Sequence, residues 1–203
     1  MLTTAAAAVA SSPFFAQWME TARAATTDLL HDTYNGFLAF IVPGPDSYSV
    51  AQGVSTAEPG GLGAGVGDLL IASIDESTVY VPQFSAVVAG ILNQLAQAVH
   101  PGITGPFLSP FACLTYPEKV AVLQIMDGTD PLKPLSGVLP AIVAFLCFSD
   151  AGVFDVATRS LDGQSVGWQI SNYSGVADGR DEFRGYFHDR RSVESEITCE
   201  RKD

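Results

Sequence analysis

Residues 135–148 read LSGVLPAIVAFLCF, the longest nearly unbroken apolar run in the chain, and they include no charged residue. A helix of this length is only about 21 Å long at 1.5 Å per residue, well short of the ~30 Å hydrocarbon core of a bilayer. Pro140 lies inside the run and predicts a kink or a restart of the helix. We therefore expect a buried central helix that other helices surround on nearly all sides, and no transmembrane segment.

Helical spacing recurs on the N-terminal side of this run. Apolar residues fall on one helix face over 26–42, 63–74, 82–99 and 115–127. The last of these has a capping box at its start, with Thr115 as N-cap and Glu118 three residues later. Because strand-like alternation is scarce, we predict a mostly α fold. It would be a single compact helical domain with long Gly/Pro-rich loops over 47–61 and 100–114.

The first 25 residues differ in composition from the rest. They contain a small and apolar stretch, LTTAAAAVASSPFFAQWMETARAA, that ends in an A-x-A cleavage pattern at 22–24. This stretch resembles the part of a twin-arginine signal that follows its Arg pair. The alternative is an Ala-rich helix that stays attached to the mature chain. We expect a signal-like segment over 1–25, a helical domain over 26–187 and a charged tail over 188–203.

Charge is large and unevenly distributed. The net charge of −12 argues against nucleic-acid binding, which needs clusters of Lys and Arg. Mean hydropathy is +0.24, which indicates a large apolar surface covered by a partner. Before Lys119 the only basic residue is Arg23, whereas six follow residue 179: Arg180, Arg184, Arg190, Arg191, Arg201 and Lys202. Arg180 and Arg184 belong either to a solvated tail or to a contact with a partner surface or with an acidic patch of this same chain.

No residue pattern indicates catalysis or a cofactor in this chain. The glycines Gly61, Gly63 and Gly65 follow no strand, so they are more simply turn residues than a nucleotide or anion site. No Ser lies in a G-x-S-x-G elbow. The remaining candidates are three histidines without metal-ligand spacing, four loop aspartates that caps and turns explain, and three cysteines without a CxxC pair. They are His31, His100 and His188; Asp127, Asp130, Asp150 and Asp155; and Cys113, Cys147 and Cys199, of which Cys113 and Cys147 could form a disulfide.

The order of short motifs resembles the gluconate 2-dehydrogenase subunit 3 family. The matching pieces are FIVPGPD at 40–46, AGVGDLLIASID at 64–75, TYPEK at 115–119 and VGWQISNYSGVADG at 166–179. The resemblance covers about residues 28–180. The loop 46–62, the segment 128–134 and the basic tail depart from it.

The resemblance implies a non-catalytic small subunit. In such complexes a large flavoprotein of the glucose–methanol–choline (GMC) type binds FAD, and a cytochrome c subunit often takes the electrons. The small subunit stabilises the flavoprotein and helps carry it through the twin-arginine exporter to the periplasm or cell exterior. Two other classes stay open: a free-standing exported binding module, and an enzyme with an acidic site built from loops.

Trp168 and Tyr173 are the predicted partner contacts, together with Arg180 and Arg184. A Trp on a Gly-bounded loop can anchor in a pocket of the large subunit and bury much apolar area. The alternative is that Trp168 folds back over the helix at 135–148 and closes the core of this chain.

Overall fold

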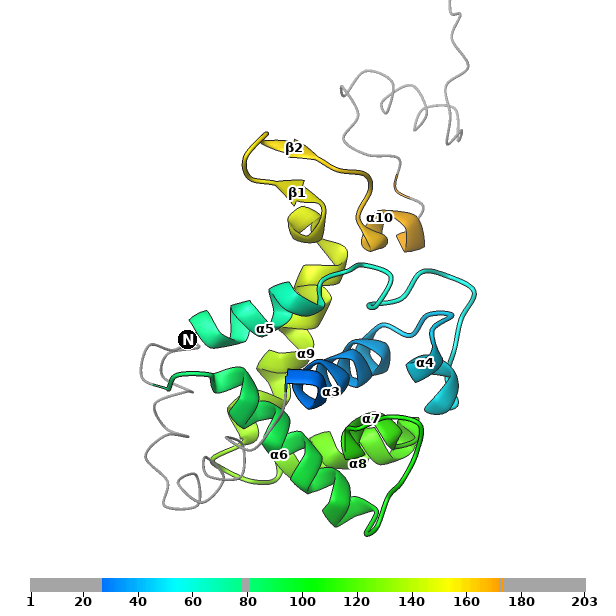
Figure 1. The fold of residues 1–203 in the computed structure, drawn as a ribbon, viewed down its shortest axis with the longest axis vertical. Helices are drawn as coiled ribbons and strands as arrows, with labels where there is room; N and C mark the ends of the chain where they lie inside the picture. The colour runs from blue at the N-terminus through cyan, green and yellow to red at the C-terminus, as the bar shows by residue number, and fades with distance from the viewer. Residues whose placement is uncertain (1–26, 78–80, 172, 174–203) are drawn as a thin grey trace, which may run out of the picture. The chain divides into compact units, whose positions relative to one another are not determined.

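The computed structural model describes residues 27–77, 81–171 and 173. In this part 61% of the residues are helical and 3% lie in strands, which confirms the predicted mostly α fold (Figure 1). All described helices and strands belong to one unit, Met1–Ser171, and residues 172–203 form another. The predicted boundaries near 25 and 187 lie outside the described residues.

The helices are α3 (Thr27–Ile41), α4 (Ser47–Ala51), α5 (Gly67–Glu76), α6 (Phe84–Val99), α7 (Pro110–Cys113), α8 (Tyr116–Asp127), α9 (Lys133–Phe148), the 3₁₀ turn η1 (Asp150–Gly152) and α10 (Val166–Ser171); the strands are β1 (Phe154–Asp155) and β2 (Ser160–Leu161).

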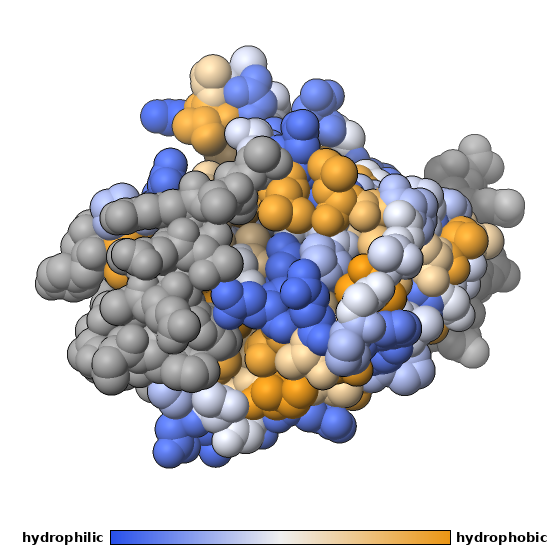
Figure 2. Space-filling view, turned by 60° about the horizontal axis from the view of Figure 1, so that its bottom comes forward, coloured by the Kyte–Doolittle hydropathy of each residue, from blue (hydrophilic) through white to orange (hydrophobic). Residues whose placement is uncertain are grey.

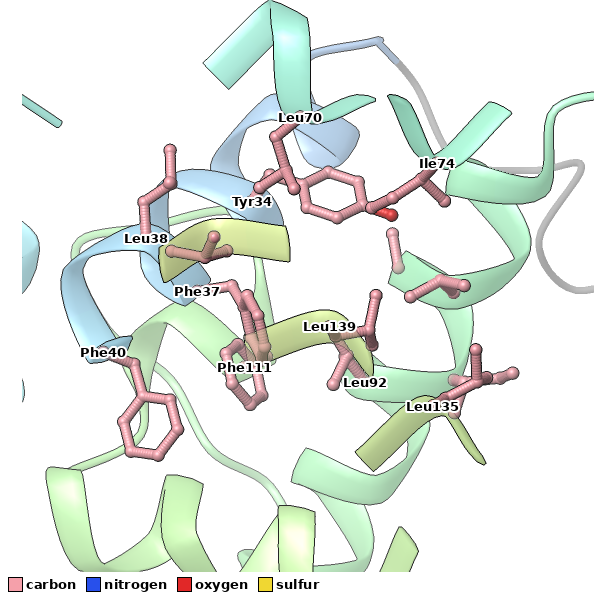
Figure 3. Packing of buried hydrophobic residues seen from close by; sticks show 14 of the residues in the cluster. Tyr34, Phe37, Leu38, Phe40, Leu70, Ile74, Leu92, Phe111, Leu135 and Leu139 are labelled. Atoms are coloured by element: carbon pink, nitrogen blue, oxygen red, sulfur yellow. The ribbon is translucent and has the colours of Figure 1, made fainter. Parts of the chain in front are cut away.

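The helix at the centre of the core is α3, which packs against α4, α5, α6, α7 and α9. Its aromatic side chains point into the cluster that Figure 3 shows. The ring of Phe37 lies 6.2 Å from that of Phe40 and 6.0 Å from that of Phe111 in α7, measured between centroids. The hydroxyl of Tyr34 is buried and donates to the carbonyl of Ser85 at 2.8 Å, so its one polar group is satisfied.

The predicted surroundings of the 135–148 helix are wrong. The helix forms as α9 and continues through Pro140, but only one of its faces is buried. Phe145 is 65% exposed and Phe148 is 47% exposed. The physical reason is that α3 occupies the middle of the core, so α9 packs on α3, α5 and α8 from one side. Its buried residues are Leu135, Leu139, Val143, Leu146 and Cys147.

The other predicted helices are confirmed with shifted ends, and two short helices were missed. The capping box of α8 is present, with Thr115 and Glu118 as predicted. Helix α4 lies in the predicted loop 47–61, where Asp46 accepts the backbone N–H of Ser49 at 2.8 Å. Helix α7 lies in the predicted loop 100–114, where the Ser109 hydroxyl accepts the backbone N–H of Ala112 at 3.1 Å. Each is too short to show a helical period, but each begins with an N-cap residue.

Lys119 in α8 is fully buried. Its ammonium donates to the carbonyl of Gly36 at 3.2 Å and to Oε1 of Gln52 at 2.9 Å, and it lies 5.5 Å from the centroid of the Phe111 ring. Both hydrogen-bond acceptors are uncharged. Burial lowers the pKa of Lys119 to about 8, although the charge of Asp46 opposes the change.

This buried lysine makes stability depend on pH. The pKa of Lys119 is about 8 in the folded chain and near 10.5 in the unfolded chain, so between these pH values the unfolded chain binds more protons. The free energy of unfolding therefore rises with pH in this window. We expect the rise from pH 7.5 to 10 to be on the order of 2 kcal/mol smaller in Lys119→Met than in wild type, measured by urea unfolding.

The matched control is Lys133→Met, which removes an exposed lysine at the start of α9. It should leave the pH profile parallel to that of wild type. Parallel profiles for wild type and Lys119→Met would contradict the assignment of the pH dependence to the buried ammonium.

Candidate partner interface

Large apolar side chains are exposed where α9 ends and the chain continues through η1, the β1–β2 hairpin and α10. We call this region, residues 145–171, the α9–α10 end; its hairpin extends beyond the C-terminus of α9 (Figure 1). Soluble proteins expose single apolar residues routinely, but several in succession indicate a contact surface. The exposed large apolar residues here are Phe145, Phe148, Phe154, Val156, Leu161 and Ile170.

Exposed apolar residues also occur away from this end. Val50 in α4 is 62% exposed and Leu108, just before α7, is 67% exposed. In Figure 2, which turns the lower side of Figure 1 toward the viewer, the visible apolar side chains form separate patches between hydrophilic ones. These two residues therefore offer a matched reference for substitutions at the α9–α10 end.

The Gly-Trp pair at 167–168 fixes α10 against the end of α9. A Cβ atom at Gly167 would lie 2.6 Å from Cα and 3.0 Å from the carbonyl oxygen of Phe148, closer than nonbonded atoms approach. The backbones thus touch because residue 167 has no side chain. This contact places Trp168 beside the exposed end of α9, where it is half-buried. The anchor role and the core role of Trp168 both stay predictions.

The other predicted interface residues lie beyond this helix. Tyr173 is 41% exposed. Arg180 and Arg184 lie outside the described residues. The structure brings Trp168 together with the apolar residues of the α9–α10 end, which the sequence pattern did not single out because Phe145 and Phe148 were expected to be buried.

A small cavity lies under the α9–α10 end. Its volume is about 50 Å³, and it is lined by residues of the loop before α5, the end of α9, η1 and the start of α10. Ser165 is 3% exposed, and its hydroxyl has no hydrogen-bond partner among the described residues; the same holds for Oδ1 of Asp150 nearby in sequence. Pockets for drug-sized ligands and cofactors measure roughly 300–1,000 Å³, so this cavity is too small for a flavin.

The candidates for metal binding or acid–base chemistry that the structure describes do not come together in one site. Within residues 27–77, 81–171 and 173, no group of three or more His, Cys, Asp or Glu could hold a metal ion. His31 pairs with Asp68 at 3.1 Å and His100 pairs with Glu118 at 2.8 Å, both as separate surface pairs. His188 lies outside the described residues.

Asp155 and Asp127 make hydrogen bonds that hold the structure around them. Asp155 accepts the backbone N–H of Ala157 at 2.8 Å and the hydroxyl of Thr158 at 2.7 Å, and these bonds lower the pKa of its carboxyl. Asp127 accepts the hydroxyl of Ser136 at 3.3 Å. The interpretation of Asp155 as a turn residue is confirmed, whereas Asp127 bonds a side chain in the first turn of α9 and not a nearby backbone amide.

The glycines and cysteines also have structural roles. A Cβ at Gly61 would lie 2.9 Å from the carbonyl oxygen of Leu38, and Gly65 has a φ of +65°. Cys113 and Cys147 carry free thiols, so the disulfide considered between them does not form. Burial raises the pKa of Cys147 to about 11, because the thiolate would be poorly solvated. Cys199 lies outside the described residues.

A polar network that the sequence did not reveal holds α7 against α3 and α6. Asn93 donates to the hydroxyl of Thr33 at 2.9 Å and accepts the hydroxyl of Ser109 at 2.6 Å. Asp32 accepts the backbone N–H of Ser109 at 2.7 Å and the hydroxyl of Tyr48 at 2.5 Å. Desolvation, with the bond to Asp32, raises the pKa of Tyr48 to about 12. The network satisfies its own donors and acceptors, which makes it a stabilising element of the fold.

Comparison with known proteins gives no assignment. No family model matches the chain, and no curated protein or solved structure matches it either. Among the described residues, no helix is both long and apolar enough to cross a membrane.

The Gly167 contact leads to a stability prediction. Gly167→Ala places a methyl group against the backbone of Phe148, so α10 must move away from α9. Overpacking of this kind costs about 1–3 kcal/mol, and we expect a lower free energy of unfolding by that amount in urea titrations. Gly137→Ala is the control: it lies inside α9 with no atom within 4 Å of the added Cβ, and helix propensity should raise stability by about 1 kcal/mol. Equal effects at both positions would contradict the described packing of α10.

Proposed function

We propose that the chain is the non-catalytic small subunit of an exported FAD-dependent dehydrogenase of the GMC type. It would bind and stabilise the flavoprotein that oxidises a sugar, polyol or alcohol, and would help export it by the twin-arginine route. FAD belongs to the partner, and a cytochrome c subunit is a further expected partner. The observation that carries the proposal is the exposed aromatic surface at the α9–α10 end, which lies beside the most specific motif of the resemblance.

The exposed side chains at this end contribute little to the core of the isolated chain. Phe145 and Phe148 point away from the face of α9 that packs on α3 and α8, while the core is filled by other residues of the same helix. Covering one such phenylalanine in an interface is worth about 1.5–3 kcal/mol. An uncovered aromatic surface favours association, so these residues support a role in binding a large partner.

The motifs behind the resemblance occupy positions that shape the fold. In FIVPGPD, a Cβ at Gly44 would lie 2.7 Å from the backbone nitrogen of Gly60, and Asp46 caps α4. In TYPEK, Thr115 and Glu118 form the capping box, and Lys119 is buried. These structural uses account for the motifs without any chemical step, which supports a subunit without its own catalysis.

A free-standing exported binding module is the second candidate. The observation in its favour is that residues 27–171 build a hydrophobic core of their own, in which side chains from α3, α5, α6, α7, α8 and α9 are buried together. Such a module would be stable and monodisperse without a flavoprotein. The predicted export segment over 1–25 lies outside the described residues and suits either candidate.

The direct test is recovery of the native complex. We expect the chain, tagged at its C-terminus after Asp203 and purified from its source, to bring down a yellow flavoprotein that mass spectrometry identifies as GMC-type. The visible flavin absorption should stay with the complex through gel filtration. A colourless, monodisperse chain recovered alone would contradict the subunit proposal and favour the binding module.

Replacing Trp168 tests the predicted anchor. Loss of a central interface Trp commonly costs more than 2 kcal/mol, so Trp168→Ala should weaken binding of the flavoprotein by more than about tenfold. The melting temperature of the isolated chain should stay close to that of wild type. A large drop in that temperature would instead identify Trp168 as part of the core of this chain.

A further inference from the structure

The β1–β2 hairpin differs from the rest of the described fold because its residues are not packed in the core. We call residues 153–162 the hairpin arm. Its two strands pair in antiparallel fashion, with Phe154 opposite Leu161 and Asp155 opposite Ser160. Every residue from 154 to 164 is exposed. In Figure 1 the arm extends past the end of α9, and a loop leads from it to α10.

The turn of the arm is held by its own hydrogen bonds. Besides the bonds from Ala157 and Thr158 to Asp155, the hydroxyls of Thr158 and Ser160 lie 2.8 Å apart. Arg159 adopts a left-handed conformation with a φ of 53°. The backbone N–H of Asp162 donates to the carbonyl of Val153 at 2.7 Å and closes the base of the hairpin. These bonds define the conformation of the turn over residues 155–160.

The apolar residues of the arm are not buried by this conformation. Phe154 is 45% exposed, Val156 is 78% exposed and Leu161 is 43% exposed. A hairpin with two residues per strand is marginally stable in water unless an apolar face is covered. A preformed turn that presents apolar side chains reduces the entropy lost on binding, which is the property of a docking element.

The charges on and around the arm indicate the chemistry of the surface that binds it. Asp155 and Asp162 flank the apolar residues of the arm, with Asp150 just before it and Arg159 as its one basic residue. The described residues as a whole include thirteen Asp and Glu against three Lys and Arg, counted over 27–77, 81–171 and 173. A complementary surface has an apolar pocket with Lys and Arg at its rim. A second copy of this acidic chain does not provide such a rim from its described residues.

We propose that the hairpin arm inserts into an apolar pocket on the flavoprotein subunit whose rim is formed by lysine and arginine side chains. This inference rests on the proposed function and adds the element and the chemistry by which the two subunits meet. Phe154, Val156 and Leu161 supply the apolar contact, and Asp155 and Asp162 pair with the basic rim. The contact of Gly167 with Phe148 places Trp168 at the end of α9 from which the arm extends.

The test compares binding of arm variants with binding of control variants to the GMC-type flavoprotein recovered with the tagged chain. Val156→Ser with Leu161→Ser removes apolar contact from the arm, and Val50→Ser with Leu108→Ser removes exposed side chains of the same two residue types elsewhere. We expect at least a tenfold loss of affinity for the arm variant and less than a twofold change for the control. Both isolated chains should melt within a few degrees of wild type, because none of the four side chains is buried.

A charge reversal tests the basic rim. Asp162→Lys should weaken binding several-fold at low salt, with a smaller loss at high salt because ions screen the repulsion. Asp130→Lys is the control, since Asp130 is exposed in the connection between α8 and α9. Asp130→Lys changes the net charge by the same amount as Asp162→Lys. The change in log Kd that it causes should be less than half of that caused by Asp162→Lys. Equal losses of affinity in the two variants would mean that the net charge of the chain acts as a whole, and would overturn the pairing of Asp162 with a basic rim.

The outcomes separate this inference from the proposed function. A photo-crosslinker at position 156 should attach to the flavoprotein, and one at position 50 should not. If wild type binds the flavoprotein but the arm variant binds equally well, the arm assignment is overturned while the subunit proposal stands. Crosslinks from position 156 to a second copy of the chain overturn the assignment as well. If wild type binds no GMC-type flavoprotein, the proposed function fails and the assignment of the arm fails with it.

Discussion

The close approach of α3 and α7 is the contact on which the rest of the structure depends. A Cβ at Gly36 would lie 2.7 Å from Cα of Ala112, so the two backbones meet because residue 36 has no side chain. This contact brings Phe111 against Phe37, and the carbonyl of Gly36 accepts the ammonium of Lys119 from α8. Any larger residue at 36 would separate α3 from α7. It would displace both the Phe111 ring and the Lys119 ammonium, so packing and polar pairing in this core are coupled.

Much of the helical pattern could be predicted from the sequence because its signals are local. The capping box at Thr115 and Glu118 acts within one turn, and the apolar face of α6 repeats over sixteen residues. Helices α4 and α7 were missed because five and four residues are too few to show a period. Their existence depends on Asp46 and Ser109 as caps, and on packing against α3, which a single segment does not contain.

The position of α9 could not be predicted for a related reason. Hydrophobicity on all sides of a helix indicates that every face is covered, but it does not say whether the same chain covers it. The sequence therefore gave no means to tell Leu139 and Val143, which are buried, from Phe145, which is exposed. For the same reason the exposed residues Phe145 and Phe148 were not predicted as part of the interface. The hairpin arm was missed because strands of two residues show no alternating pattern.

The buried and the exposed face of α9 have different roles. The face with Leu139 and Val143 completes the core of residues 27–171, and that core includes neither Phe145 nor Phe148. Exposed aromatic side chains make a chain prone to association, and the strongly acidic surface limits this among identical copies by mutual repulsion. The same charge attracts a surface of opposite sign. Apolar contact at the α9–α10 end would then supply affinity, while the carboxylates around it would select which partner approaches.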